Sequence, residues 1–398
     1  MMGSMMRRAM IGDSATLNVD FTSMTNGGQL ANAGFTFTNA TTTARTYINS
    51  NGLLTTATTN EPRFDHDPIT RAPRGLLVEA QSVNVVPYSN GSTAWTVGGN
   101  RTPTYNTTDL LSPDGTNNAT KIVCGAAPNY AAFGQTISGL TGGATYTVSY
   151  WIRGPVGHTP RLYAVNGTVG DVTATSTTGT YNNTGWTRLT QTYTLPALTT
   201  QVYVYFLSTN FVTTGDTFYV YGFQMETGAG ASSLIPTGAS QVQRLADECS
   251  MTGTNFSSWF NATEGTFLAH ARRIRTTDLG RIVSANDNTT TESIDLGADT
   301  TGEFIVTDGG SALATISPGT VTANTAFKIA GAYKLNDVQA ALGGTLGTAD
   351  TSVTLPTVDR LMVGRQAGGS PVYLNGTVAV LKYWPTRLTN AQLQSFTT

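Results

Sequence analysis

Apolar and polar residues alternate in many short stretches of the chain. In residues 145–153, every second residue from Tyr146 to Ile152 is large and apolar or aromatic, while Trp151 and Arg153 fall on the opposite side. A similar alternation occurs at residues 202–207 and 218–225, and again at 265–271, 327–333 and 377–384. Because successive side chains of a strand point to opposite faces of a sheet, these stretches are predicted to be half-buried β-strands.

Turn signals separate these stretches. Asn-Gly pairs begin at residues 26, 51, 90, 166 and 375, and Asp-Gly pairs begin at residues 114 and 308. Both dipeptides favour the tight turns that join antiparallel strands. The sequence therefore predicts an all-β fold of tandem antiparallel β-sandwiches. One helix is expected at the C-terminus, where Thr389 or Asn390 can cap it and Leu393 and Phe396 share a face.

The same patterns divide the chain into three segments. Residues 1–85 form a small β-rich segment with strands at 17–21 and 74–79. This segment is expected to attach the protein to another structure. Residues 86–232 have the strand content of a jelly-roll sandwich. The run Gly-Ala-Gly-Ala-Ser-Ser at 228–233 is a linker, and residues 233–398 are expected to form a second sandwich.

Composition narrows the range of functions. Charged residues make up 12% of the chain, about half the usual share, and Thr, Asn, Gly and Ser take their place. The net charge is −2, so a basic face for nucleic acid is not expected. No apolar run approaches the roughly 18 residues that would suggest membrane insertion. The two cysteines, Cys124 and Cys249, lack metal-ligand spacing and are expected to remain free thiols.

Motifs for catalysis are incomplete. Gly12-Asp13-Ser14 resembles the nucleophile block of GDS-type esterases, but no histidine of the chain has the Asp three positions earlier that such enzymes use. Glycosidases need paired carboxylates, and Glu248, Glu264 and Asp295 are candidates only by default. Asp65-His66-Asp67 offers metal or acid–base groups, but the flanking prolines also suit a turn. The protein is therefore expected not to be an enzyme.

Several blocks resemble bacteriophage structural proteins that are described as head-spike, head-fibre or tail-fibre proteins. The usual pattern is matched at residues 61–68, 74–79 and 84–89, although Val83 and 85–87 depart from it. Residues 112–116 and 223–228 are similar to the jelly roll of carbohydrate-binding modules. Residues 373–376 and 383–390 are similar to concanavalin A-like, laminin G-like sandwiches.

This resemblance implies a virion protein, assembled in the host bacterial cytoplasm, that serves as a capsid- or tail-attached fibre or decoration. Its expected partners are major capsid or tail proteins, further copies of itself, and polysaccharide of the host surface. Arg7 and Arg8, in the Met-rich N-terminus, are candidates for attachment to the particle. The alternatives are a tail receptor-binding protein and a polysaccharide depolymerase.

Candidate ligand residues lie in the middle segment. Aromatic side chains can stack on sugar rings and arginines can donate to hydroxyls, although most such aromatics in sandwiches belong to the core. The candidates for glycan contact are Trp95, Tyr130, Trp151, Arg153, Arg161 and Trp186. No cofactor is expected other than a structural calcium ion, for which Asp114, Asn117 and Asn118 have suitable oxygens unless they only shape a turn.

Overall fold

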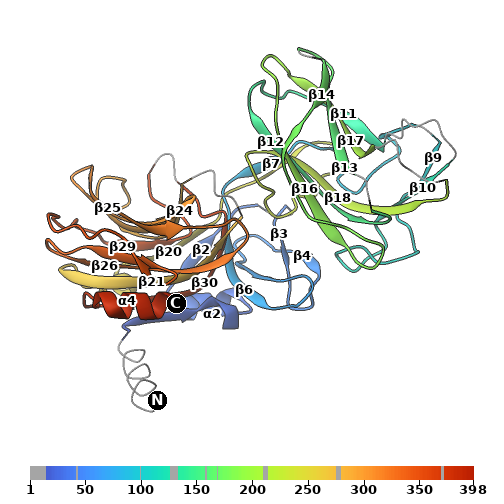
Figure 1. Cartoon of the computed structure of the whole chain (residues 1–398). Coiled ribbons are helices and arrows are strands. Elements are labelled where there is room, and N and C mark those ends of the chain that lie inside the picture. Colours follow the sequence, from blue (N-terminus) through green and yellow to red (C-terminus); the bar gives the residue numbers. More distant parts are fainter. Residues whose placement is uncertain are drawn as a thin grey trace.

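The computed structural model describes residues 15–41, 44–98, 100–125, 133–156, 159–167, 169–208, 214–274, 279–368 and 372–398. In this part of the chain almost all regular structure is antiparallel β-sheet, which confirms the predicted all-β fold of tandem sandwiches. Two sandwiches lie side by side and are joined by a narrower region (Figure 1). No helix in the described residues is long and apolar enough to cross a membrane.

The larger body, here called the main sandwich, consists of two sheets. The first has the order β28 (Thr345–Leu346), β27 (Gln339–Leu342), β26 (Ala326–Lys334), β21 (Glu264–Arg273), β30 (Gly376–Trp384), β6 (Pro73–Val78) and β5 (Arg63–His66), and β1 (Leu17–Asp20) also pairs with β30. The second has the order β2 (Thr36–Thr38), β20 (Glu248–Thr252), β29 (Arg360–Val363), β22 (Gly280–Asn286), β23 (Ser293–Ala298), β24 (Thr301–Asp308) and β25 (Ser311–Thr320).

These sheets enclose one continuous core. Phe267, Ile282, Leu296, Phe304 and Leu381 are fully buried in it. Val19 and Phe64, from strands near the N-terminus, belong to the same core. The N-terminal strands are thus part of this sandwich by packing as well as by hydrogen bonding.

The smaller body, here called the insert sandwich, also has two sheets. One, here called the β12 sheet, has the order β15 (Ala174–Thr178), β16 (Thr187–Thr194), β12 (Thr145–Arg153), β18 (Thr217–Thr227), β10 (Thr120–Cys124) and β9 (Arg101–Thr104). The other, here called the β17 sheet, has the order β14 (Gly170–Val172), β13 (Thr159–Ala164), β17 (Gln201–Ser208), β11 (Phe133–Ser138) and β8 (Thr96–Val97). Val148, Tyr150, Val204 and Phe223 are fully buried between them.

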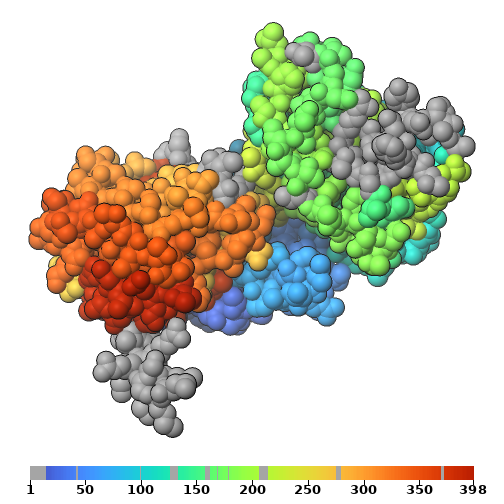
Figure 2. Space-filling model, in the orientation of Figure 1, coloured from blue at the N-terminus to red at the C-terminus, as the bar shows by residue number. Residues whose placement is uncertain are grey.

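The insert sandwich leaves and rejoins the main sandwich through paired strands. β7 (Ser82–Asn84) and β19 (Val242–Arg244) pair antiparallel, with Val83 opposite Gln243. A second small sheet, the hairpin of β3 (Thr46–Ile48) and β4 (Leu54–Thr56), comes from the N-terminal region. That region occupies the angle between the two bodies (blue in Figure 2).

This arrangement differs from the three successive segments expected from the sequence. β1, β5 and β6 lie in one sheet of the main sandwich and β2 lies in the other. Residues 1–85 are therefore not a separate unit in their described part. The alternating pattern identifies a strand but not its partners, and β6 pairs with β30, about 300 residues later, as well as with β5.

In the described part of the chain, helices are few and short. They are η1 (Phe21–Ser23), α2 (Gly27–Asn32), α3 (Thr254–Ser257) and α4 (Asn390–Thr397). The predicted C-terminal helix is present, and Thr389 caps it in a capping box with Gln392. The Asn26-Gly27 pair does not form a hairpin turn, because the Asn26 side chain instead accepts a hydrogen bond from Gln29 and caps α2.

Candidate functional site

A cavity of about 560 Å³ lies where the two sandwiches and the β3–β4 hairpin meet, and it is called here the junction cavity. Trp151, Arg188 and Thr190 line it from the outer face of the β12 sheet, and Tyr47 and Ile48 line it from the hairpin. The linker at 229–234 and residues 323–324 of the main sandwich complete the wall. Pro68, Ser176 and Asn324 are exposed lining residues, so the cavity opens to solvent.

Trp151 forms the back of this cavity rather than an open platform. Its side chain is 7% exposed and packs with Leu54, Tyr221 and Leu234. The Arg188 guanidinium lies 4.6 Å from the centre of the indole, and the Tyr221 ring meets the indole edge-on at 6.0 Å. The strand register explains the first contact, because Trp151 and Arg188 are directly opposed on β12 and β16.

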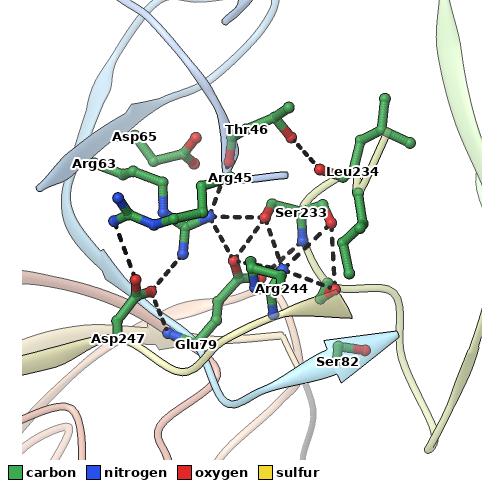
Figure 3. A network of polar contacts seen from close by, with 12 residues as sticks. Arg45, Thr46, Arg63, Asp65, Glu79, Ser82, Ser233, Leu234, Arg244 and Asp247 are labelled. Atoms are coloured by element: carbon green, nitrogen blue, oxygen red, sulfur yellow. Dashed lines mark hydrogen bonds and ion pairs between the residues drawn. The ribbon is translucent and has the colours of Figure 1, made fainter. Parts of the chain in front are cut away.

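A network of buried charges stands beside the cavity (Figure 3). Arg63 contacts Glu79 at 2.7 Å and Asp247 at 2.5 Å, with all three side chains inaccessible to solvent. Arg45 contacts Asp247 at 3.2 Å and Arg244 contacts Glu79 at 3.1 Å. These groups come from strands and loops on both sides of the junction, so the network fixes the relative positions of the β3–β4 hairpin, the β7–β19 pair and the main sandwich.

The pKa values of these groups reflect their pairing. Burial acts to raise the pKa of Glu79, but the Arg244 and Arg63 guanidiniums outweigh it and lower the pKa to about 2. Burial likewise acts to lower the pKa of Arg63, and the carboxylates of Asp247 and Glu79 more than offset it, so that the pKa is raised. Glu79 is therefore held as a carboxylate.

The Asp65-His66-Asp67 motif lies at the edge of this region. Its first two residues end β5, so they are part of a strand rather than a turn. Asp65 and Asp67 both contact Arg74, at 3.3 and 2.8 Å. His66 directs Nδ1 to the carbonyl oxygens of Phe64 and Ile48, at 3.0 and 3.2 Å. The carboxylates of the motif are thus already engaged by an arginine.

The other glycan candidates fall in different places. Trp95 is 3% exposed and packs in the insert core against Phe133 and Phe223, so its indole offers no open face. Trp186 is half-buried and donates to the Leu111 carbonyl at 2.8 Å. Arg153 is half-buried and donates to the Asn183 carbonyl at 2.8 Å. The structure brings Trp151 and Trp186 into one cluster and leaves Trp95 and Arg153 outside it.

The side chains of four candidate residues for attachment or glycan contact lie outside the description of the structure. Arg7, Arg8 and Tyr130 lie outside the described residues, and Arg161 belongs to β13 but its side chain is outside the description. Their predicted roles in attachment and sugar contact stay predictions.

The calcium candidates act as turn-forming groups. The Asp114 carboxylate accepts hydrogen bonds from Ser112 at 2.7 Å and from Asn118 at 2.8 Å. It also accepts from Tyr221 at 3.1 Å, and Asn117 is exposed. Within the described residues, no three His, Cys, Asp or Glu side chains come together as metal ligands. Calcium binding here stays a prediction.

A second candidate surface, here called the tyrosine face, was not singled out as a site from the sequence. Tyr203 and Tyr205 lie on the outer side of β17, and Tyr163 of β13 is directly opposite Tyr203. All three are half-buried, and the rings of Tyr203 and Tyr205 stack at 4.1 Å. The alternation of tyrosines with buried Val202 and Val204 is the signal that could have indicated this face.

Residues 84–213, which cover most of the insert sandwich, match a family model described as a carbohydrate binding domain. The chain therefore contains a lectin-like β-sandwich of the carbohydrate-binding type. No curated protein matches the chain in sequence.

Solved structures with partial likeness include glycan-binding and sialidase proteins. The CBM40 of the Ruminococcus gnavus IT-sialidase, bound to α2,3-sialyllactose, is 14% identical with a TM-score of 0.33, covering 36% of this chain and 88% of that one. Botulinum neurotoxin type C is 9% identical with a TM-score of 0.31, covering 38% and 39%. A mutant Trypanosoma rangeli sialidase is 15% identical with a TM-score of 0.28, covering 34% and 23%.

Proposed function

We propose that this protein binds glycans and that its tyrosine face is the contact surface. The outer side of a sandwich sheet normally carries polar side chains, and here neighbouring strands place three half-buried tyrosines there. Each tyrosine supplies an apolar ring for the C–H side of a sugar, although the hydroxyl of Tyr203 is buried. This surface, within a region that matches a carbohydrate-binding family, is the observation that carries the proposal.

Affinity electrophoresis of the whole protein in gels containing polysaccharide tests this proposal. Tyr205→Ala is expected to weaken binding to the best-retarding polysaccharide by about tenfold, equivalent to about 1.4 kcal/mol. Tyr205→Phe keeps the ring and is expected to retain most of the affinity. Tyr219→Ala is the matched control, because Tyr219 is also half-buried but lies on the other sheet and bonds to Asp109. Equal losses in both alanine variants would contradict the proposal.

We also propose that binding is not coupled to catalysis. The carboxylates nearest the junction cavity, Asp65 and Glu79, are each engaged by arginine, at 3.3 Å for Asp65 with Arg74 and at 2.7 Å for Glu79 with Arg63. A general acid needs a proton to donate, and Glu79 has a pKa lowered to about 2. Burial raises the pKa of Asp65, but its carboxylate is held by Arg74 and accepts from the Ile48 backbone nitrogen at 2.9 Å. Incubation with the retarding polysaccharide should release no reducing ends, and their release would identify a depolymerase.

The place of action that we propose is a bacteriophage particle. The support is the sequence resemblance at residues 61–68 and 74–79, which form β5 and β6 of the main sandwich. In this proposal the main sandwich is displayed on the virion as a homo-oligomer, contacts capsid or tail proteins, and presents the insert sandwich to host polysaccharide. Purified particles should contain the chain in fixed stoichiometry by mass spectrometry, and its absence from particles would overturn this placement.

A further inference from the structure

One arginine at the junction cavity differs from its neighbours in its contacts. Arg45, Arg63 and Arg244 are in ion pairs with Asp247 and Glu79. Arg74, which also lines the cavity, is in ion pairs with Asp65 and Asp67. Glu226 accepts hydrogen bonds from Ser82 at 2.6 Å, Gln224 at 2.6 Å, and Ser232. Arg188 adds a further positive charge and forms no ion pair within the described residues.

The position of Arg188 is well defined even though it lacks an ion pair. Its guanidinium lies over Trp151, and one terminal nitrogen donates to Ser149 at 3.0 Å. Its Nε is buried and has no hydrogen-bond partner. Packing against the indole holds the side chain at the cavity wall, where the terminal nitrogens, and not the buried Nε, are the donors that a bound group could reach.

The electrostatics agree with this geometry. Burial lowers the pKa of Arg188 to about 10, and the Glu226 and Glu79 carboxylates offset that effect only in part. In Arg63, by contrast, adjacent carboxylates raise the pKa above its usual value despite complete burial. Burial lowers the pKa of the ion-paired Arg45 and Arg244 as well, so the absence of a close anion at Arg188, among the described residues, is shown by the contacts and not by the pKa.

The wall also includes Asp65 and Glu79, whose carboxylates are paired with arginines, and the neutral remainder of the wall suits a sugar ring. Ser176 and Thr190 bring hydroxyls from β15 and β16, and Asn324 brings an amide from the main sandwich. Tyr47 and Pro68 on the opposite side offer apolar surface for C–H groups. The volume of about 560 Å³ is within the range of small-ligand sites, roughly 300–1,000 Å³.

We infer that the junction cavity is a second ligand site and that it takes a saccharide bearing a carboxylate, such as a uronic acid, with the carboxylate on Arg188. A planar guanidinium pairs with a carboxylate through two parallel hydrogen bonds. The site lies on the β12 sheet and is separate from the tyrosine face on the β17 sheet. Either site can therefore fail without the other.

Isothermal titration calorimetry of the full chain tests this inference. The probes are trigalacturonic acid, a hyaluronan tetrasaccharide and an alginate trisaccharide, with galactotriose as the neutral comparison. At least one acidic probe is expected to bind ten times more tightly than galactotriose, and its affinity should fall with rising salt. Arg188→Gln should reduce that affinity at least tenfold, and Arg188→Lys should reduce it less.

Two controls separate this site from general effects. Arg153→Gln removes the same charge from the end of β12, outside the cavity lining, and should leave the affinity for the acidic probe unchanged. Tyr205→Ala should also leave it unchanged, because Tyr205 is on the other sheet. The melting temperature of Arg188→Gln should fall only slightly, since the substitution removes the contact with Trp151 and the hydrogen bond to Ser149 but breaks no ion pair.

Three outcomes would overturn the inference. They are no binding of any acidic probe, equal loss of affinity in Arg188→Gln and Arg153→Gln, and displacement of the acidic probe by equimolar inorganic phosphate. The last outcome would reveal a general anion site. If neutral polysaccharide still binds through the tyrosine face, the glycan-binding proposal survives each of these results.

Discussion

At the scale of single residues, the junction depends on charges that are buried because they are paired. Glu79 accepts from both the backbone nitrogen and the hydroxyl of Ser233, each at 2.7 Å, in addition to its two arginines. Such groups stay ionised in the interior only when hydrogen bonds and opposite charges replace the water that they lose. The loss of one partner is therefore more damaging than the loss of an exposed ion pair.

Arg63→Met should destabilise the protein by about 3–5 kcal/mol, because it leaves the carboxylates of Glu79 and Asp247 short of positive charge in a buried site. Urea unfolding, followed by tryptophan fluorescence, measures this change. The matched control is Arg360→Met, which breaks the more exposed pair with Asp359 and should cost less than about 1 kcal/mol. Similar effects of the two substitutions would show that the network contributes little.

The pH dependence of stability should follow Glu79. Its pKa is about 2 in the folded protein against an ordinary value of 4.5, so the unfolded chain takes up the proton first as the pH falls. The stabilisation is therefore complete above about pH 4.5 and is lost between there and pH 2, by roughly 3 kcal/mol at most. Urea unfolding at pH 5.5 and pH 3 measures it. Glu79→Gln should be less stable at pH 5.5 but change less with pH, and an unchanged slope would contradict this assignment.

At the scale of elements, the alternating pattern was sufficient to locate strands whatever their partners, and short turns also indicated which strands pair. The stretch at 145–153 forms β12 and the one at 327–333 lies within β26. The Asp308-Gly309 pair joins β24 to β25, as its turn preference predicts. The sequence could not predict which face of a strand is covered. The face of β12 that carries Trp151 is covered by the hairpin of residues 46–56, about 100 residues earlier in the chain.

The pairing of β6 with β30 should depend on Gly75. This residue has φ +92°, and a Cβ there would lie 2.2 Å from the carbonyl oxygen of Val378. Gly75→Ala should therefore lower the melting temperature of the main sandwich far more than Gly309→Ala, where φ is +59° and the Cβ would meet nothing within 4 Å. The control isolates the cost of positive φ, about 1–2 kcal/mol. Equal shifts in differential scanning calorimetry would mean that the strands can separate at little cost.

At the scale of the whole molecule, one sandwich is inserted into another. The N-terminal strands and the strands after residue 247 build the main sandwich, and the chain between them builds the insert. The sequence indicated two sandwiches but placed the boundary of the first after an independent N-terminal segment. Non-local pairing of this kind leaves no local signal, since β1 and β30 are each ordinary alternating strands. The junction cavity was likewise beyond prediction, because its walls come from distant parts of the chain.

The insertion of one sandwich into the other predicts which parts of the chain can fold alone. A fragment of residues 233–398 lacks β1, β2, β5 and β6, so it exposes the edge of β30 and part of the shared core, and it should aggregate or remain unfolded. Replacement of residues 86–229 by a short Gly-Ser linker keeps β7 paired with β19, and keeps Ser233 beside Glu79. This shortened chain should give a cooperative thermal transition and a β-type circular dichroism spectrum, whereas the fragment should give neither. A folded, monomeric fragment would show that the N-terminal strands are dispensable, and the view of the main sandwich as one unit would then be wrong.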